Sequence, residues 1–223
     1  KKSILLLAGI FLVNSLSFAQ KNKQEQEDRA TIKSSNYSSF KWREIGPSLT
    51  SGRIADIAVN PENFNEYYVA AAAGGVWKTT NHGVSFTPIF DSQGSYSIGC
   101  VTIDPNNSNV VWVGTGENNN QRSVAYGDGV YKSTDGGSSW KKVGLENSEH
   151  IGMITVNPSN SNEVYVAAYG PLWSSGGDRG LYKTLDGGLT WEKILDVSEN
   201  TGFNEVHLDP RDPNTVYATA HQR

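Results

Sequence analysis

The sequence has very little cysteine: Cys100 is the only one among 223 residues, so an internal disulfide is impossible. No group of His and Cys residues has the spacing of a zinc site, and no glycine-rich phosphate loop precedes a helix. A Ser-His-Asp signature is also missing. Acidic residues outnumber basic ones, 23 to 19, and no Lys/Arg cluster occurs. We therefore expect no metal, no cofactor and no nucleic-acid partner.

Long amphipathic helical patterns are absent from the body of the chain. Instead, 23 glycines gather between short runs rich in Val, Ile, Tyr and Trp. Such runs, separated by glycine-rich turns, are typical of strands. The pattern predicts an all-β fold.

Residues 1–19 have the features of a signal peptide. Two lysines precede an apolar run at 4–13 that is too short to span a bilayer, and small residues then stand where a signal peptidase cuts, before Gln20. Residues 20–39 are polar and without periodicity, which predicts a flexible lead-in. We expect a secreted, periplasmic or cell-surface bacterial protein with no transmembrane segment after cleavage.

An internal repeat is the most informative feature. Residues 79–86, 133–140 and 184–191 all read Ser/Thr, any, Asp/Asn, any, Gly, any, Ser/Thr, aromatic. The motif recurs about every 50 residues, a period typical of propellers and other repeat folds. An Asn-Pro or Asp-Pro pair keeps the same period, at positions 60, 104, 157 and 209. Two markers with one period indicate a true repeat.

Each motif, an Asp box, has a structural explanation. Its Asp or Asn can accept hydrogen bonds from nearby backbone amides, and its Gly permits a positive φ in the turn. The aromatic ring can fill the space between packed sheets. We expect structural roles for Asn81, Gly83, Phe86, Asp135, Gly137, Trp140, Asp186, Gly188 and Trp191.

Each repeat divides into four strands, and four-stranded blades repeated radially form a β-propeller. We expect a partial propeller over 40–223, about three and a half blades. Its blades would span about 53–91, 97–145 and 150–196, with an incomplete blade at 202–223. Residues 40–46 resemble a fourth strand and are predicted to close the ring. Because propellers usually have four to eight blades, further blades are expected beyond the sequence.

The Asp boxes resemble the bacterial neuraminidase repeat. The run from Trp42 to Arg223 resembles sortilin-type propellers in the N-terminal part of large secreted bacterial proteins, of a kind often labelled glycosyl hydrolase. Related propellers occur in sortilin receptors, photosystem II assembly factors and xyloglucan-cleaving enzymes. The resemblance implies the fold rather than one function, since these relatives bind peptides, assist assembly or cut polysaccharide.

Two enzyme classes implied by this resemblance can be compared residue by residue. The xyloglucanases carry a catalytic Asp two residues before a Gly-Gly pair, and the matching residue is Ala72, which cannot act as acid or base. Sialidases use an arginine cluster, of which Arg53 resembles one member, although Ala55 stands where Pro is usual. We expect Arg53 to make local hydrogen bonds at the start of a strand.

The loops between second and third strands are longer in repeats two and three than in repeat one, and binding residues concentrate on such loops. Candidate catalytic carboxylates are Glu117 and Asp128. Candidate ligand-binding residues are Asn118, Arg122, Tyr126, Trp173, Asp178, Arg179 and His221. The structural alternatives are a Glu117–Arg122 pair, a loop ordered by Asp178 and Arg179, and a Trp173 ring lying on the blade surface.

We interpret the chain as a sortilin-like scaffold that binds a peptide, protein or polysaccharide. The alternative is a glycoside hydrolase, xyloglucanase-like or sialidase-like, whose site is completed by further blades. The sequence leaves open whether the protein is an enzyme.

Overall fold

The computed structural model describes Ser39 and residues 52–118 and 124–222, and the architecture below concerns residues 52–222. The predicted signal peptide and the closing strand at 40–46 lie outside the described residues, as does the lead-in except for Ser39. Arg122 also lies outside them. The described part of the chain contains no helix that could cross a membrane.

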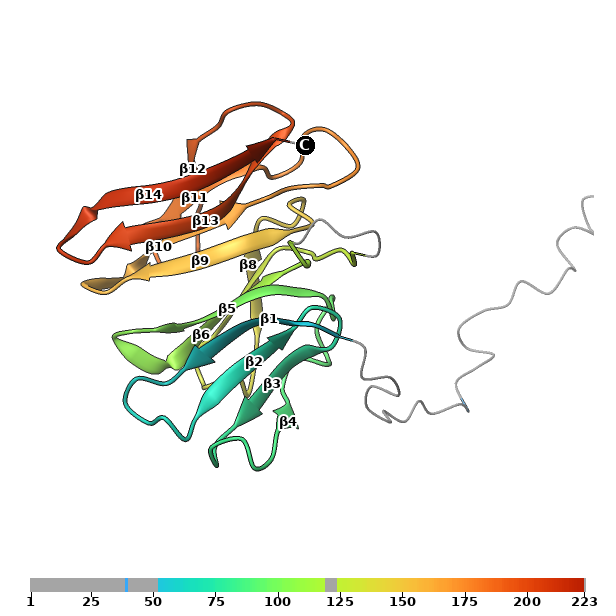
Figure 1. Ribbon diagram of the computed structural model, residues 1–223, viewed down its shortest axis with the longest axis vertical. Coiled ribbons are helices and arrows are strands. Elements are labelled where there is room, and N and C mark those ends of the chain that lie inside the picture. Colours follow the sequence, from blue (N-terminus) through green and yellow to red (C-terminus); the bar gives the residue numbers. More distant parts are fainter. Residues whose placement is uncertain (1–38, 40–51, 119–123, 223) are drawn as a thin grey trace, which may run out of the picture. The chain divides into compact units, whose positions relative to one another are not determined.

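The described chain forms antiparallel sheets in sequence order (Figure 1). Blade one consists of β1 (Ile54–Val59), β2 (Tyr67–Ala71), β3 (Gly75–Thr79) and β4 (Thr87–Pro88). Blade two consists of β5 (Ile98–Asp104), β6 (Asn107–Thr115), β7 (Val130–Ser133) and β8 (Lys141–Gly144). Blade three consists of β9 (Ile151–Asn157), β10 (Asn160–Ala168), β11 (Gly180–Thr184) and β12 (Glu192–Leu195). A two-stranded sheet of β13 (Thr201–Asp209) and β14 (Asp212–Gln222) follows.

The prediction of an all-β, partial β-propeller is confirmed. Each four-stranded sheet follows chain order, and the first strands β1, β5, β9 and β13 contact one another in succession. Consecutive blades bury apolar side chains between them. Tyr68 and Phe90 of blade one pack in one cluster with Ile98 and Val101 of blade two, all of them buried. Burial of this kind is the main stabilisation of the stack.

Cys100 lies in the apolar cluster between blades two and three, together with Trp112 and Ile154. The register of β5 against β6 shifts between Ile98 and Cys100, so strict alternation of side chains fails at this point. Burial raises the pKa of the Cys100 thiol well above its usual range, so it behaves as a small apolar side chain.

The Asp boxes form tight hydrogen-bonded turns. In blade two, the Asp135 carboxylate accepts bonds from the Ser133 hydroxyl at 2.7 Å and the Ser139 amide at 2.8 Å. Gly137 adopts a positive φ of 89° and donates its amide to the Ser133 hydroxyl. The same bonds recur around Asp186 of blade three, and Asn81 of blade one makes the corresponding amide and hydroxyl contacts.

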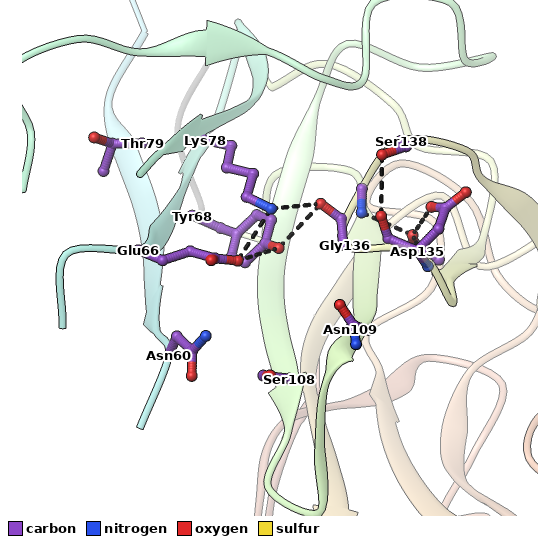
Figure 2. A network of polar contacts seen from close by, with 12 residues as sticks. Asn60, Glu66, Tyr68, Lys78, Thr79, Ser108, Asn109, Asp135, Gly136 and Ser138 are labelled. Carbon is purple, nitrogen blue, oxygen red and sulfur yellow. Dashed lines mark hydrogen bonds and ion pairs between the residues drawn. The ribbon is translucent and has the colours of Figure 1, made fainter. Parts of the chain in front are cut away.

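The boxes of blades two and three connect each blade to the preceding one. In Figure 2 the Lys78 ammonium and the Tyr68 hydroxyl of blade one both donate to the main-chain carbonyl of Gly136, at 3.0 and 3.1 Å. The junction of blades two and three repeats the contact, because Lys132 donates to the carbonyl of Gly187 at 2.9 Å. One polar contact thus recurs at both junctions.

Candidate functional site

A pocket of about 700 Å³ lies where loops of blades one and two meet, beyond the ends of β2 and β6. We call it the blade-junction pocket. It is lined by Arg53, Ala72, Ala73, Tyr96, Glu117, Val124, Ala125 and Tyr126. Its size is in the range of small-ligand sites, and its lining combines aromatic rings with a few polar groups.

Arg53 and Glu117 form an ion pair across the two blades within this pocket. The Nε of Arg53 donates to Oε1 of Glu117 at 2.8 Å, and Nη2 donates to the same oxygen. The Glu117 side chain is only 4% exposed, whereas that of Arg53 is 55% exposed. The Arg53 side chain therefore acts across the blades, while its main-chain carbonyl makes the expected local bond by accepting the Ala72 amide at 2.8 Å. Glu117 pairs with Arg53, while the alternative partner Arg122 lies outside the described residues.

Two serines hold the walls of the pocket. The buried Ser97 hydroxyl donates to the carbonyl of Ala125 at 2.9 Å and accepts the amide of Glu117 at 3.0 Å. Ser95 donates to the carbonyl of Tyr126 at 2.9 Å. Buried polar groups satisfied in this way fix the backbone around them. The position of Glu117 is thus set by its main chain as well as by its ion pair.

Tyr96 and Tyr126 present their side chains to solvent at the pocket. They are 64% and 57% exposed, which is high for large aromatic residues. Their main chains are nevertheless fixed, since the Gly75 amide donates to the Tyr96 carbonyl at 2.9 Å. The Tyr126 ring also lies 5.9 Å from the ring of the buried His150. Exposed aromatic rings on a fixed backbone are suited to stacking against a ligand.

Asp128, the second carboxylate considered from the sequence, does not line the pocket. It accepts the Tyr131 hydroxyl at 2.6 Å and pairs with the Lys142 ammonium at 2.7 Å. The Thr115 hydroxyl lies 3.3 Å from its other oxygen. These partners place Asp128 among the strands of blade two. Of the described residues that line the pocket, Glu117 is the one carboxylate.

The long loop of blade three is ordered by Arg179. This residue is buried and donates to the main-chain carbonyls of Tyr169, at 2.9 Å, of Pro171, and of Ser174, at 2.7 Å. Burial lowers the pKa of its guanidinium. Asp178 accepts the Asn147 amide at 2.9 Å. For these two predicted ligand-binding residues, the loop-ordering alternative describes the contacts.

The remaining candidates lie apart from the pocket lining. Trp173 is 62% exposed on the blade-three loop. Nδ1 of His221 lies 2.6 Å from the Tyr169 hydroxyl, and the two rings stack at 5.6 Å. Asn118 donates to the carbonyl of Gly152 at 3.2 Å. Of the described loop residues that the sequence singled out, Glu117 and Tyr126 line the pocket and the others do not.

Sequence reasoning missed Tyr96 and the serines as pocket residues. One signal was present, because a serine precedes the first strand of blades two and three at matching positions, Ser95 and Ser148. The Ser148 hydroxyl donates to the carbonyl two residues ahead, that of His150, and the Ser95 hydroxyl lies 3.3 Å from the corresponding carbonyl of Ser97. In the described ranges, no group of three or more His, Cys, Asp or Glu residues could hold a metal ion.

No family model matches the chain, so its resemblance to sortilin-type and neuraminidase repeats stays a prediction. Curated relatives are xyloglucanases. The chain is 26% identical over 192 residues to a xyloglucanase of Hypocrea jecorina, covering 80% of the chain and 22% of that protein. It is 28% identical over 181 residues to a xyloglucanase of Paenibacillus, covering 79% and 16%. The chain thus spans less than a quarter of either relative.

Solved structures give a similar picture. An ancestral GH74 enzyme superposes with a TM-score of 0.61 at 26% identity, over 76% of this chain and 22% of that one. The GH74 enzyme of Niastella koreensis gives 0.57 at 22% identity, over 75% and 26%, a likeness of fold alone. The chain is therefore a partial β-propeller that is similar in sequence to xyloglucanases and in fold to GH74 enzymes.

Proposed function

We propose that this chain is part of a propeller protein that acts on a β-glucan of the xyloglucan type. The blade-junction pocket would bind the glycan. The observation that carries the proposal is the pocket itself, where the Arg53–Glu117 pair lies beside two exposed tyrosines. Similarity to xyloglucanases over about 80% of the chain supports the same substrate class.

The chemistry of the pocket suits a sugar chain. A pyranose has apolar faces that stack on aromatic rings, here Tyr96 and Tyr126, and hydroxyls that need both donors and acceptors. Arg53 supplies planar N–H donors, and the two tyrosine hydroxyls can both donate and accept. Hydrogen bonds hold the main chain at Glu117, Tyr96 and Tyr126, which lowers the entropic cost of binding.

Hydrolysis would need a second group. Glycoside cleavage generally uses two carboxyl groups on either side of the scissile bond, and Glu117 is the one carboxylate lining the pocket in the described chain. Ala72, which matches the catalytic Asp of the xyloglucanases, also lines the pocket and offers no acid or base. This observation favours a second candidate function, glycan binding without cleavage at this pocket. Cleavage by the whole protein would depend on carboxylates from other blades.

The test uses the full-length secreted protein with xyloglucan, other β-glucans, sialosides and a peptide library. Retention on immobilised xyloglucan supports the proposal, and release of new reducing ends adds hydrolysis to it. Retention without reducing ends supports the second candidate. Binding to peptides or sialosides, with none to β-glucans, contradicts both.

A further inference from the structure

The described charged residues at the blade-junction pocket form one neutral pair. Of the described residues that line it, Arg53 and Glu117 are the charged ones, and they neutralise each other. The other lining residues are alanine, valine and tyrosine. A neutral ion pair offers no net attraction to an anion, and the exposed edge of Arg53 can still donate to hydroxyls.

We propose that the pocket selects neutral sugars over uronic acids, and that Glu117 sets this selectivity by occupying the guanidinium of Arg53. The inference rests on the proposed glycan function and adds the residue that determines which glycans enter.

The geometry of Arg53 shows why a counter-charge matters. Both Nε and Nη2 are directed at Oε1 of Glu117, and no described residue accepts a hydrogen bond from Nη1. The side chain is more than half exposed, so its outer edge can reach a ligand. An exposed arginine without a partner would bind a carboxylate through two parallel hydrogen bonds. Glu117 takes that place.

Glu117 is also fixed in the wall. Its side chain is 4% exposed, and the Ser97 hydroxyl holds its amide at 3.0 Å. An incoming uronate could take the Nε and Nη2 edge of Arg53 only by breaking the contact with Glu117. Two carboxylates would then share one guanidinium, and like charges at short range disfavour each other. A sugar hydroxyl has no such penalty.

The experiment compares the unchanged full-length protein with Glu117→Gln, which keeps the shape of the side chain and removes its charge. Binding is measured by calorimetric titration with a xyloglucan oligosaccharide and with a trigalacturonate. Glu192→Gln on β12 of blade three is the matched charge control. The double variant Arg53→Gln/Glu117→Gln tests whether any gain depends on the guanidinium, and thermal unfolding verifies that each variant is folded.

We expect the unchanged protein to bind the neutral oligosaccharide at least about tenfold more tightly than the uronate, a difference within the range of one charge-assisted contact. Glu117→Gln should bind the uronate about tenfold more tightly than before, with strong salt dependence. The double variant should lose that gain. Equal binding of both probes by the unchanged protein, or an unchanged ratio in Glu117→Gln, overturns the inference alone. Binding of neither probe by the unchanged protein overturns the proposed function and this inference with it.

Discussion

The indole Nε1 of Trp140 donates a hydrogen bond to the main-chain carbonyl of Ile89, 2.8 Å away in the preceding blade. Trp191 makes the same bond to Val143 at 2.7 Å, one repeat later. The tryptophan that ends an Asp box therefore has a second role besides packing, because its indole N–H forms a hydrogen bond to the preceding blade. In blade one the position is Phe86, which contacts Tyr67 of its own blade edge-on.

Replacing Trp140 with Phe should destabilise the propeller. The ring would still pack near Phe90, but the Ile89 carbonyl would lose its donor, at a cost of about 1 kcal/mol. Urea unfolding of the full-length protein measures the change. Val84→Ala, at a position 84% exposed in the first box, should change stability by less than about 0.5 kcal/mol. Equal effects of the two substitutions would contradict the bridging role.

The lysine contacts between blades predict that two substitutions differ in how much stability they cost. The Gly136 carbonyl accepts hydrogen bonds from two side chains, Lys78 and Tyr68. The Gly187 carbonyl accepts one from Lys132. Lys132→Met should therefore cost more than Tyr68→Phe, about 1–2 kcal/mol against less than about 1 kcal/mol. Lys132 also lies 4.6 Å from the Trp112 ring centre, a cation–π contact that methionine cannot make. Denaturant unfolding of both variants compares them, and the reverse order would refute this view of the junction.

The Asp boxes predict how stability depends on pH. Hydrogen bonds from the Ser139 hydroxyl and amide hold the pKa of Asp135 at about 2, below its ordinary 3.8. The pKa of Asp186 is lowered as well, chiefly by the hydroxyl and amide of Thr190. Because the folded pKa is depressed, the stabilisation is complete above about pH 4 and is lost as the pH falls towards 2.

Unfolding measured at several pH values should thus show a loss of stability below about pH 4. Asp135→Asn, which copies Asn81 of the first box, should make that loss less steep. A pH profile identical to that of the unchanged protein would show that Asp135 does not contribute to it.

Ser97→Ala should weaken both the fold and the pocket. It removes a buried hydroxyl that serves the Ala125 carbonyl and the Glu117 amide, so we expect a loss of about 1–3 kcal/mol in stability and weaker glycan binding. Ser138→Ala is the control, since Ser138 is exposed in the second Asp box. Calorimetric titration and thermal unfolding measure the two effects, and unaltered glycan affinity in Ser97→Ala would argue against its supporting role.

The repeat made the fold predictable from the sequence, because turn chemistry and strand patterns are local properties. The box around Asp135 has the bonds that its residue types imply. The pocket was harder to predict from the sequence. Glu117 and Tyr126 stood out as loop residues, but the partner of Glu117 is Arg53, 64 positions away in another blade. Such pairings depend on how blades stack, which no local pattern specifies.

Calorimetric titration of the full-length protein with a xyloglucan oligosaccharide, compared with a Tyr96→Ala/Tyr126→Ala double variant, tests the glycan pocket most directly. Tyr217→Ala, at a similarly exposed tyrosine of β14, is the control. We predict saturable binding that weakens about tenfold in the double variant, from the loss of two stacking rings, and is unchanged in the control. Affinity equal in all three proteins, or no binding by the unchanged one, would contradict the account.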